Sequence, residues 1–164
     1  MKVQSNSYTF IYSTIIVLVV ATGLALVATA LKPAQDKNVE VEKKQNILTS
    51  LHVNSDRSNA EKLYTQYITD SYTLNTRGEK VNGVDPFTIN LRAELKKQPS
   101  ERNLPAFEAK KGDTSFIVIP VYGKGLWGPI WGYVSFKREK EVAEGLPHFN
   151  VIYGVMFDHK GETP

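Results

Sequence analysis

The sequence predicts an α+β protein, with one N-terminal transmembrane helix followed by a domain of helices and antiparallel strands. An uncharged apolar run covers residues 8–31. Three runs rich in β-branched and aromatic residues follow near the other end of the chain, at residues 114–122, 130–136 and 149–157. Sequential strands with short links between them favour an antiparallel meander.

The apolar run at residues 8–31 is long enough to cross a bilayer, which takes about 20 residues of helix. It is apolar on all sides, unlike an amphipathic helix that lies at the membrane surface. A cleavable signal peptide is the alternative, because Ala28-Thr29-Ala30 has the form of a cleavage site. The run exceeds the roughly 7–15 apolar residues of a signal peptide, so we expect an uncleaved anchor. We expect Lys32-Pro33 to end this helix, and the basic residues around it leave its orientation open.

The residues after the anchor divide into three regions. Residues 32–53 are expected to form a juxtamembrane helix with one apolar face, made by Val39, Ile47, Leu48 and Leu51. Residues 54–112 are expected to be a helical and irregular subregion, with a helix at 59–69, a polar β-leaning segment at 71–76 and an irregular span at 99–112 that contains two prolines. Residues 113–164 would then hold the sheet. Three strands are a thin core, so the domain is expected to be incomplete.

The composition excludes several kinds of site. The chain has no Cys, which rules out disulfides, Cys-ligated zinc and iron–sulfur clusters. Its net charge of +3 is spread along the chain, which does not suggest a nucleic-acid partner. No two of the three histidines, His52, His148 and His159, have metal-ligand spacing on one element. Hydrolase and P-loop motifs are missing, so we expect no catalytic residue and no metal site.

The segment from Gly123 to Gly128 matches the G-x-G-x-x-G dinucleotide-binding pattern. In that fold a helix must follow the glycines to receive the pyrophosphate. Here Pro129 and a β run follow instead, so the pattern does not predict a Rossmann site. The residues alone favour a structural hairpin loop over a ligand-binding loop. In the second interpretation, Trp127 and Trp131 would lie beside an aromatic ligand.

Several segments taken together resemble one known family. They are Gly125-Leu126-Trp127-Gly128-Pro129-Ile130-Trp131-Gly132-Tyr133, the strand end Gly154-Val155-Met156-Phe157, the tail His159-Lys160-Gly161-Glu162-Thr163-Pro164, and Leu31–Gln35 and Lys43–Leu48 after the anchor. This combination resembles the C subunit of the sodium-translocating NADH:quinone reductase, a bacterial respiratory complex. The resemblance extends from Ser5 to Pro164.

The resemblance implies an FMN-binding domain and a set of flavin contacts. Gly125, Leu126, Trp127 and Gly128 match the family's loop near the isoalloxazine, and Glu162 and Thr163 match a segment that hydrogen-bonds near the flavin. In the family, FMN is attached through its phosphate to a threonine in a Ser-Gly-Ala-Thr type motif downstream of Glu-Thr-Pro. That motif is absent from this sequence. The resemblance therefore implies a subunit truncated before its covalent FMN site.

The resemblance also implies a location and a role. The tail at residues 1–7 would be cytoplasmic, and the domain would lie in the periplasm, held by one helix in the bacterial inner membrane. The subunit would carry single electrons within a sodium-pumping complex that oxidises NADH and reduces ubiquinone. Its partners would be the other subunits and the lipid bilayer, and the chain would catalyse nothing alone.

Three alternatives remain open at this stage. The chain could be the G subunit of an Rnf-type ferredoxin:NAD oxidoreductase, which also has one anchor and a covalent FMN. It could be an anchored binding or assembly module without a cofactor. A signal-bearing secreted domain is the third alternative.

Overall fold

The computed structural model describes residues 6–126, 128–138 and 149–159, and leaves out the side chains of residues 149 and 150. The chain divides into two compact units, Met1–Val39 and Glu40–Pro164. Trp127, Glu162 and Thr163, three of the expected flavin contacts, lie outside the described residues.

The first unit consists of the N-terminal part of helix α1 (Asn6–Ser50). Its apolar side chains are exposed all round, as Phe10, Val19 and Leu26 illustrate at 74%, 66% and 67%. Within the described part of the chain, α1 is the one helix long and apolar enough to cross a membrane. This agrees with the expected anchor.

The expected helix end at Lys32-Pro33 is wrong. Helix α1 continues through Pro33 as far as Ser50 and includes most of the expected juxtamembrane helix. A proline inside a helix removes one hydrogen bond and crowds the preceding turn, but it does not have to end the helix. An ion pair one turn apart, from Lys32 Nζ to Asp36 Oδ1 at 3.1 Å, spans the proline.

In the part of the chain that the structure describes, the second unit is built on an antiparallel sheet of six strands in the order β2-β1-β3-β4-β5-β6. The strands are β1 (Ile68–Leu74), β2 (Lys80–Val81), β3 (Leu104–Lys111), β4 (Thr114–Lys124), β5 (Pro129–Arg138) and β6 (Phe149–His159). From β3 onward each strand pairs with the next one along the chain. The expected meander and the α+β class are confirmed.

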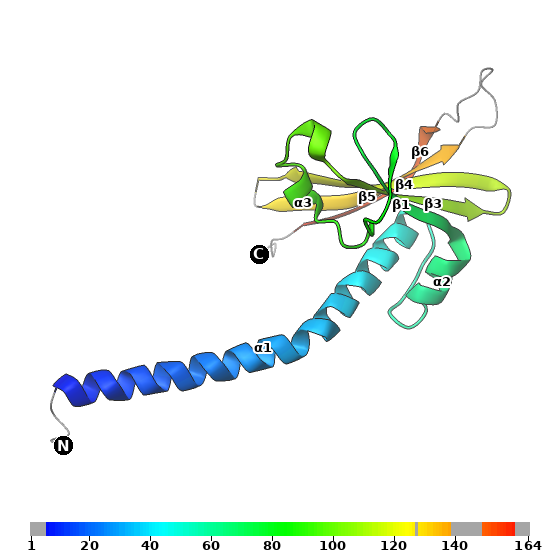
Figure 1. The fold of residues 1–164 in the computed structure, drawn as a ribbon. Coiled ribbons are helices and arrows are strands. Elements are labelled where there is room, and N and C mark those ends of the chain that lie inside the picture. The colour runs from blue at the N-terminus through cyan, green and yellow to red at the C-terminus, as the bar shows by residue number, and fades with distance from the viewer. Residues whose placement is uncertain (1–5, 127, 139–148, 160–164) are drawn as a thin grey trace. The chain divides into compact units, whose positions relative to one another are not determined.

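The end of α1 and helix α2 (Ala60–Tyr67) cover one face of this sheet. The last turns of α1 and helix α2 lie on the same side (Figure 1). Ile47, Leu48 and Leu51 are at most 1% exposed and form the core with Phe107, Phe116, Val118 and Tyr133 of the sheet. The apolar face that the sequence assigned to this helix is therefore the face that packs, with Val39 outside it at 51% exposure.

The span at residues 99–112, expected to be irregular, contains the central strand β3. It begins with a short 3₁₀ helix, η1 (Pro99–Glu101), and residues 104–111 then pair with both β1 and β4. Pro105 lies near the start of β3, where a proline is tolerated, opposite Thr73. Within the described residues the sheet therefore has six strands instead of three, and the argument from a thin core does not hold.

Candidate functional site at the β4–β5 turn

The turn between β4 and β5 carries the expected loop residues. β4 ends at Lys124 and β5 begins at Pro129. Across the turn, the amide of Gly125 donates to the carbonyl oxygen of Gly128 over 2.7 Å. Leu126 is 90% exposed, the largest exposure among the exposed apolar side chains of the described residues. An apolar side chain held out at the tip of a closed turn is suited to contact with a ligand or a partner.

Two glycines near the turn have structural explanations. A Cβ at Gly125 would lie 2.6 Å from Cδ1 of Ile130, so the side chain of Ile130 occupies this space. A Cβ at Gly132 would overlap the carbonyl oxygen of Met156 and lie 2.6 Å from the ring of Phe157. Strand packing accounts for both glycines. The packing against Ile130 therefore agrees with a structural role for Gly125, and the ligand-binding interpretation of the loop stays a prediction.

A row of three paired residues, two of them aromatic, crosses the sheet near the turn. The register pairs Tyr122 of β4 with Trp131 of β5, and Trp131 with Asp158 of β6. Alternation along β5 puts Trp131 on the same face as the core residue Tyr133. All three residues of the row are half-buried. Trp131 and Tyr122 therefore present ring surface at this end of the sheet.

The ladder between β5 and β6 brings the C-terminal segment to the same end. His159 pairs with Ile130, two residues beyond Gly128 of the turn. The turn and the start of the tail are thus neighbours, although more than thirty positions separate them in the sequence. The positions of Glu162 and Thr163 themselves fall outside the described residues.

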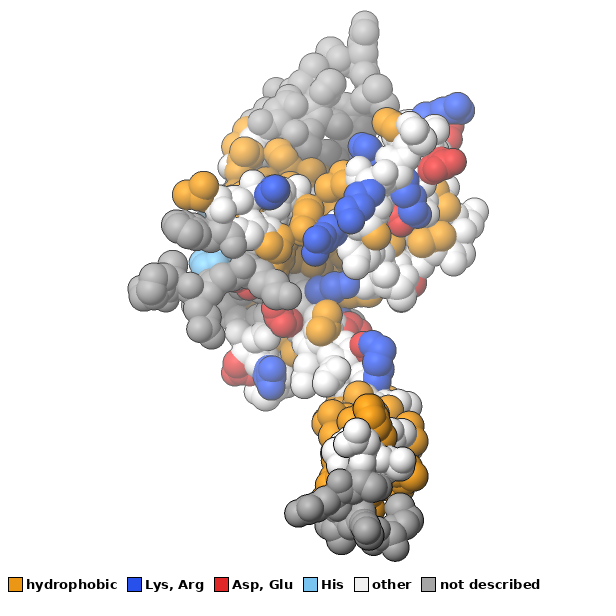
Figure 2. Space-filling model, turned by 90° about the vertical axis from the view of Figure 1, so that its left-hand side faces the viewer, with side chains coloured by type: hydrophobic (Ala, Val, Ile, Leu, Met, Phe, Trp, Pro, Cys, Tyr) orange, Lys and Arg blue, Asp and Glu red, His pale blue; other side chains and the backbone are white. Residues whose placement is uncertain are grey.

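The structure also has an apolar surface that sequence reasoning missed. On the sheet face opposite the helices, Val155 and Phe157 of β6 are 50% and 57% exposed, and Ile130 of β5 is 38% exposed. The signal was present in the run from Phe149 to Phe157, which is apolar at nearly every position and so is apolar on both faces of a strand. Viewed from the end of the sheet with the turn, hydrophobic side chains lie among Lys and Arg side chains (Figure 2).

The described residues contain no group of three His, Cys, Asp or Glu that could hold a metal ion. His52, one of the three histidines, lies two residues after the end of α1. It adopts a left-handed backbone with φ of 55°, and its Nε2 is 3.2 Å from the carbonyl oxygen of Tyr153. The ring of His52 also packs on that of Tyr153, with centroids 5.0 Å apart. These contacts give His52 a structural role in the junction between α1 and β6.

Comparison with known proteins points to one family. No family model matches the sequence. The Na⁺-translocating NADH-quinone reductase C subunit of Haemophilus ducreyi is 24% identical, in a match that covers 98% of this chain and 65% of that protein. The crystal structure of the same subunit from Parabacteroides distasonis has a TM-score of 0.67 and 36% identity, covering 82% of this chain and 60% of that one. The crystal structure of Shewanella oneidensis NqrC, at a TM-score of 0.60 and 23% identity, has the same fold.

These relatives and solved structures are all the C subunit of this reductase, and the similarity extends over most of the chain. The expected resemblance is confirmed. The chain spans just under two thirds of the length of the curated relatives that it matches.

Proposed function

We propose that this homologue of the C subunit of the Na⁺-translocating NADH-quinone reductase is a membrane-anchored protein that carries electrons by means of FMN. The observation that supports this role most directly is the β4–β5 turn, because Leu126 is almost fully exposed at its tip and the two strands that it joins carry the half-buried Trp131 and Tyr122. The relatives are named as one subunit of a reductase, which implies further subunits.

The residues at the turn fit a flavin ring. An isoalloxazine is flat and largely apolar, and aromatic and aliphatic side chains bind such rings. When bound, FMN would supply one-electron redox chemistry. Leu126 would contact the ring, and Trp131 and Tyr122 would limit the access of water at this end of the sheet. Lys124, exposed at the end of β4, is the described cation nearest to the turn in sequence and could pair with the phosphate.

The remaining parts of the proposal concern location and partners. The exposed apolar part of α1 would anchor the chain in the bacterial inner membrane, with the domain in the periplasm. No residue of this chain would act as an acid or base, so catalysis would belong to the assembled complex. The relatives reported above are of the quinone-reductase type, which favours this role over the Rnf-type G subunit.

The test is to isolate the full-length protein from membranes of its source and to run it on a denaturing gel. Flavin in the native protein is the expected result, and flavin fluorescence that stays with the denatured polypeptide would show covalent attachment. If neither the denatured nor the native protein contains flavin, the proposal is wrong, and the cofactor-free assembly module becomes the better interpretation.

The site within the protein has a separate test. Because Leu126 is almost fully exposed, Leu126→Ser should leave the fold intact and change only what touches the turn. We expect this variant, Trp127→Ala and Glu162→Ala to shift the flavin reduction potential or lower flavin occupancy. Arg57→Ala, an exposed change before α2, is the control. If all three variants match the control, the site assignment is wrong.

A further inference from the structure

The segment from Asn90 to Asn103 forms a braced loop that ends one residue before β3. It contains helix α3 (Leu91–Glu94) and η1. The nearly buried carboxylate of Glu94 ties its two ends together, because one oxygen accepts from Lys97 Nζ at 2.7 Å and the other from the amide of Asn103 at 2.9 Å. The guanidinium of Arg102 adds two bonds, to the carbonyl oxygens of Lys97 and Leu95, each at 3.1 Å. These bonds hold the loop in one conformation.

The outer surface of this loop is basic. It carries Arg92, Lys96, Lys97 and Arg102 against two acidic residues, Glu94 and Glu101. Neither Arg92 nor Lys96 has an ion-pair partner among the residues that the structure describes. Arg92 lies on α3, and the exposed Leu95 and Lys96 follow directly after it, in a turn in which the amide of Lys96 donates to the carbonyl oxygen of Ala93. Two unpaired cations and an apolar side chain are thus displayed from a rigid base.

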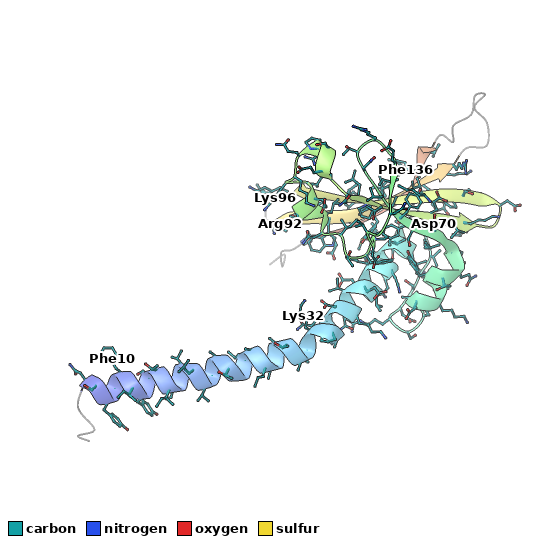
Figure 3. All side chains as sticks on the ribbon, viewed as in Figure 1. Phe10, Lys32, Asp70, Arg92, Lys96 and Phe136 are labelled. Atoms are coloured by element: carbon teal, nitrogen blue, oxygen red, sulfur yellow. The ribbon has the colours of Figure 1, made fainter. Side chains whose placement is uncertain are left out.

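This loop lies at the end of the sheet that carries the candidate site. Helix α3 packs against β4, the strand that leads into the turn. Figure 1 shows α3, the β4–β5 turn and the end of β6 at the same end of the sheet. Arg92 and Lys96 are labelled at that end in Figure 3, and Figure 2 shows Lys and Arg side chains beside hydrophobic ones there. Whatever binds to the basic loop therefore comes close to Leu126.

We propose that Arg92, Lys96 and Leu95 form a docking surface for an acidic face of another subunit of the same complex. The inference rests on the proposed function, because it assumes an electron-transfer partner. Charge complementarity would steer that partner to the end of the sheet with the turn, and steering of this kind raises association rates by roughly 10- to 1000-fold at low salt. The apolar side chain of Leu95 would be covered in the docked state.

A protein partner suits this surface better than a lipid surface. An anionic membrane attracts basic segments through net charge and does not need a fixed conformation. Here a buried carboxylate and a bonded guanidinium are used to hold a short loop rigid, and rigidity favours recognition of one complementary surface. Binding of this surface to anionic lipid is therefore the competing result that the experiment distinguishes.

The experiment uses the full-length protein within its assembled complex, in nanodiscs of zwitterionic lipid. The test variant is Arg92→Glu with Lys96→Glu. The matched control is Arg57→Glu with Lys62→Glu, which makes the same charge change at and before α2. Electron transfer through the complex and retention of the other subunits are measured between about 20 and 200 mM salt, with flavin content determined for each sample.

We expect the test variant to lose about tenfold in transfer rate at low salt and to retain less of the other subunits, with normal flavin content and a flatter salt dependence. The control should behave as the parent. Equal rates and retention for both variants would overturn the proposal. So would a defect that appears only when anionic lipid is added, since that result assigns the surface to the membrane. A chain without flavin would refute the proposed function instead, and retention of the other subunits would still test the docking surface.

Discussion

The hydroxyl of Ser135 on β5 donates to the carbonyl oxygen of Ser50, the last residue of α1, at 2.6 Å. Both residues are fully buried. The same hydroxyl lies 3.1 Å from the carbonyl oxygen of Gly154 on β6. The end of α1 is thus bound to β5 and β6, and this junction connects the last turn of α1 to the sheet.

Replacement of Ser135 by Ala should destabilise the domain by about 1–3 kcal/mol, because a buried carbonyl oxygen of Ser50 loses its donor. Urea denaturation of the full chain in detergent, followed by tryptophan fluorescence, measures this loss. Ser100→Ala removes an exposed hydroxyl from η1 and should have almost no effect. If the two variants unfold at the same urea concentration, the hydrogen bond contributes little.

Gly154→Ala should disturb the same junction by crowding it. A Cβ at this position would overlap the carbonyl oxygen of Ser50 and lie 2.5 Å from Nε2 of His52. The His52 ring also contacts Tyr153, so it cannot move away freely. We expect a loss of about 1–3 kcal/mol in the free energy of unfolding. Gly123→Ala is the control, since its Cβ would meet no heavy atom within 4 Å. Comparable losses in the two variants would contradict this account.

The β4–β6 meander could be read from sequence, because its strands are rich in β-branched and aromatic residues whose local preference agrees with the fold. β3 could not. Its sequence, Leu104–Lys111, holds a proline, two alanines and three charged residues, which favour strands weakly. It is a strand because β1 and β4 pair with it on both sides and because Phe107 and Ala109 fill the core.

The same contrast holds for the candidate site. The turn from Gly125 to Gly128 was found in the sequence, since glycines between two strands mark a hairpin. The row formed by Tyr122, Trp131 and Asp158 was not, because it depends on strand register, which no local pattern specifies. The braced loop around Glu94 was missed for a related reason, since its bonds join residues that carry no recognisable motif.

Lys44 should contribute to stability mainly through its apolar stem. Its side chain is 9% exposed, and its Nζ lies 2.7 Å from Glu40 and 3.3 Å from Glu61, over the rings of Tyr64 and Phe87. Burial alone would lower the pKa of Lys44, but hydrogen bonds with Glu40 and Glu61 raise it above its ordinary value. The amine is therefore charged at neutral pH.

We expect Lys44→Met to cost about 1 kcal/mol, since the partner carboxylates are 48% and 69% exposed and water can solvate them. Lys44→Ala should cost about 2–3 kcal/mol, because the stem that packs on Tyr64 and Phe87 is lost as well. Urea midpoints of the two variants measure the difference, with Lys62→Ala on exposed α2 as control. Equal losses for the two variants would show that charge pairing, which both of them remove, outweighs the packing of the stem.

Glu94 should make the domain sensitive to acid. Hydrogen bonds from Lys97 and from the amide of Asn103 lower the pKa of Glu94 below its ordinary value of 4.5. A carboxylate with a lowered pKa in the folded state stabilises the fold above its unfolded-state pKa, and this contribution is lost as the pH falls through the lower, folded value. Stability should therefore decrease below about pH 4.5 partly through this residue.

In Glu94→Gln this part of the pH dependence should disappear. The variant should be less stable than the parent at pH 7, because the brace from Lys97 loses its charged acceptor. The stability difference between the two proteins should then shrink steadily toward pH 3, as protonation neutralises the parent's carboxyl. Urea denaturation at half-unit pH steps measures this difference. Glu101→Gln removes an exposed carboxylate of the same loop and is the control. A difference between parent and Glu94→Gln that stays constant with pH would show that the Glu94 brace depends on shape and not on charge.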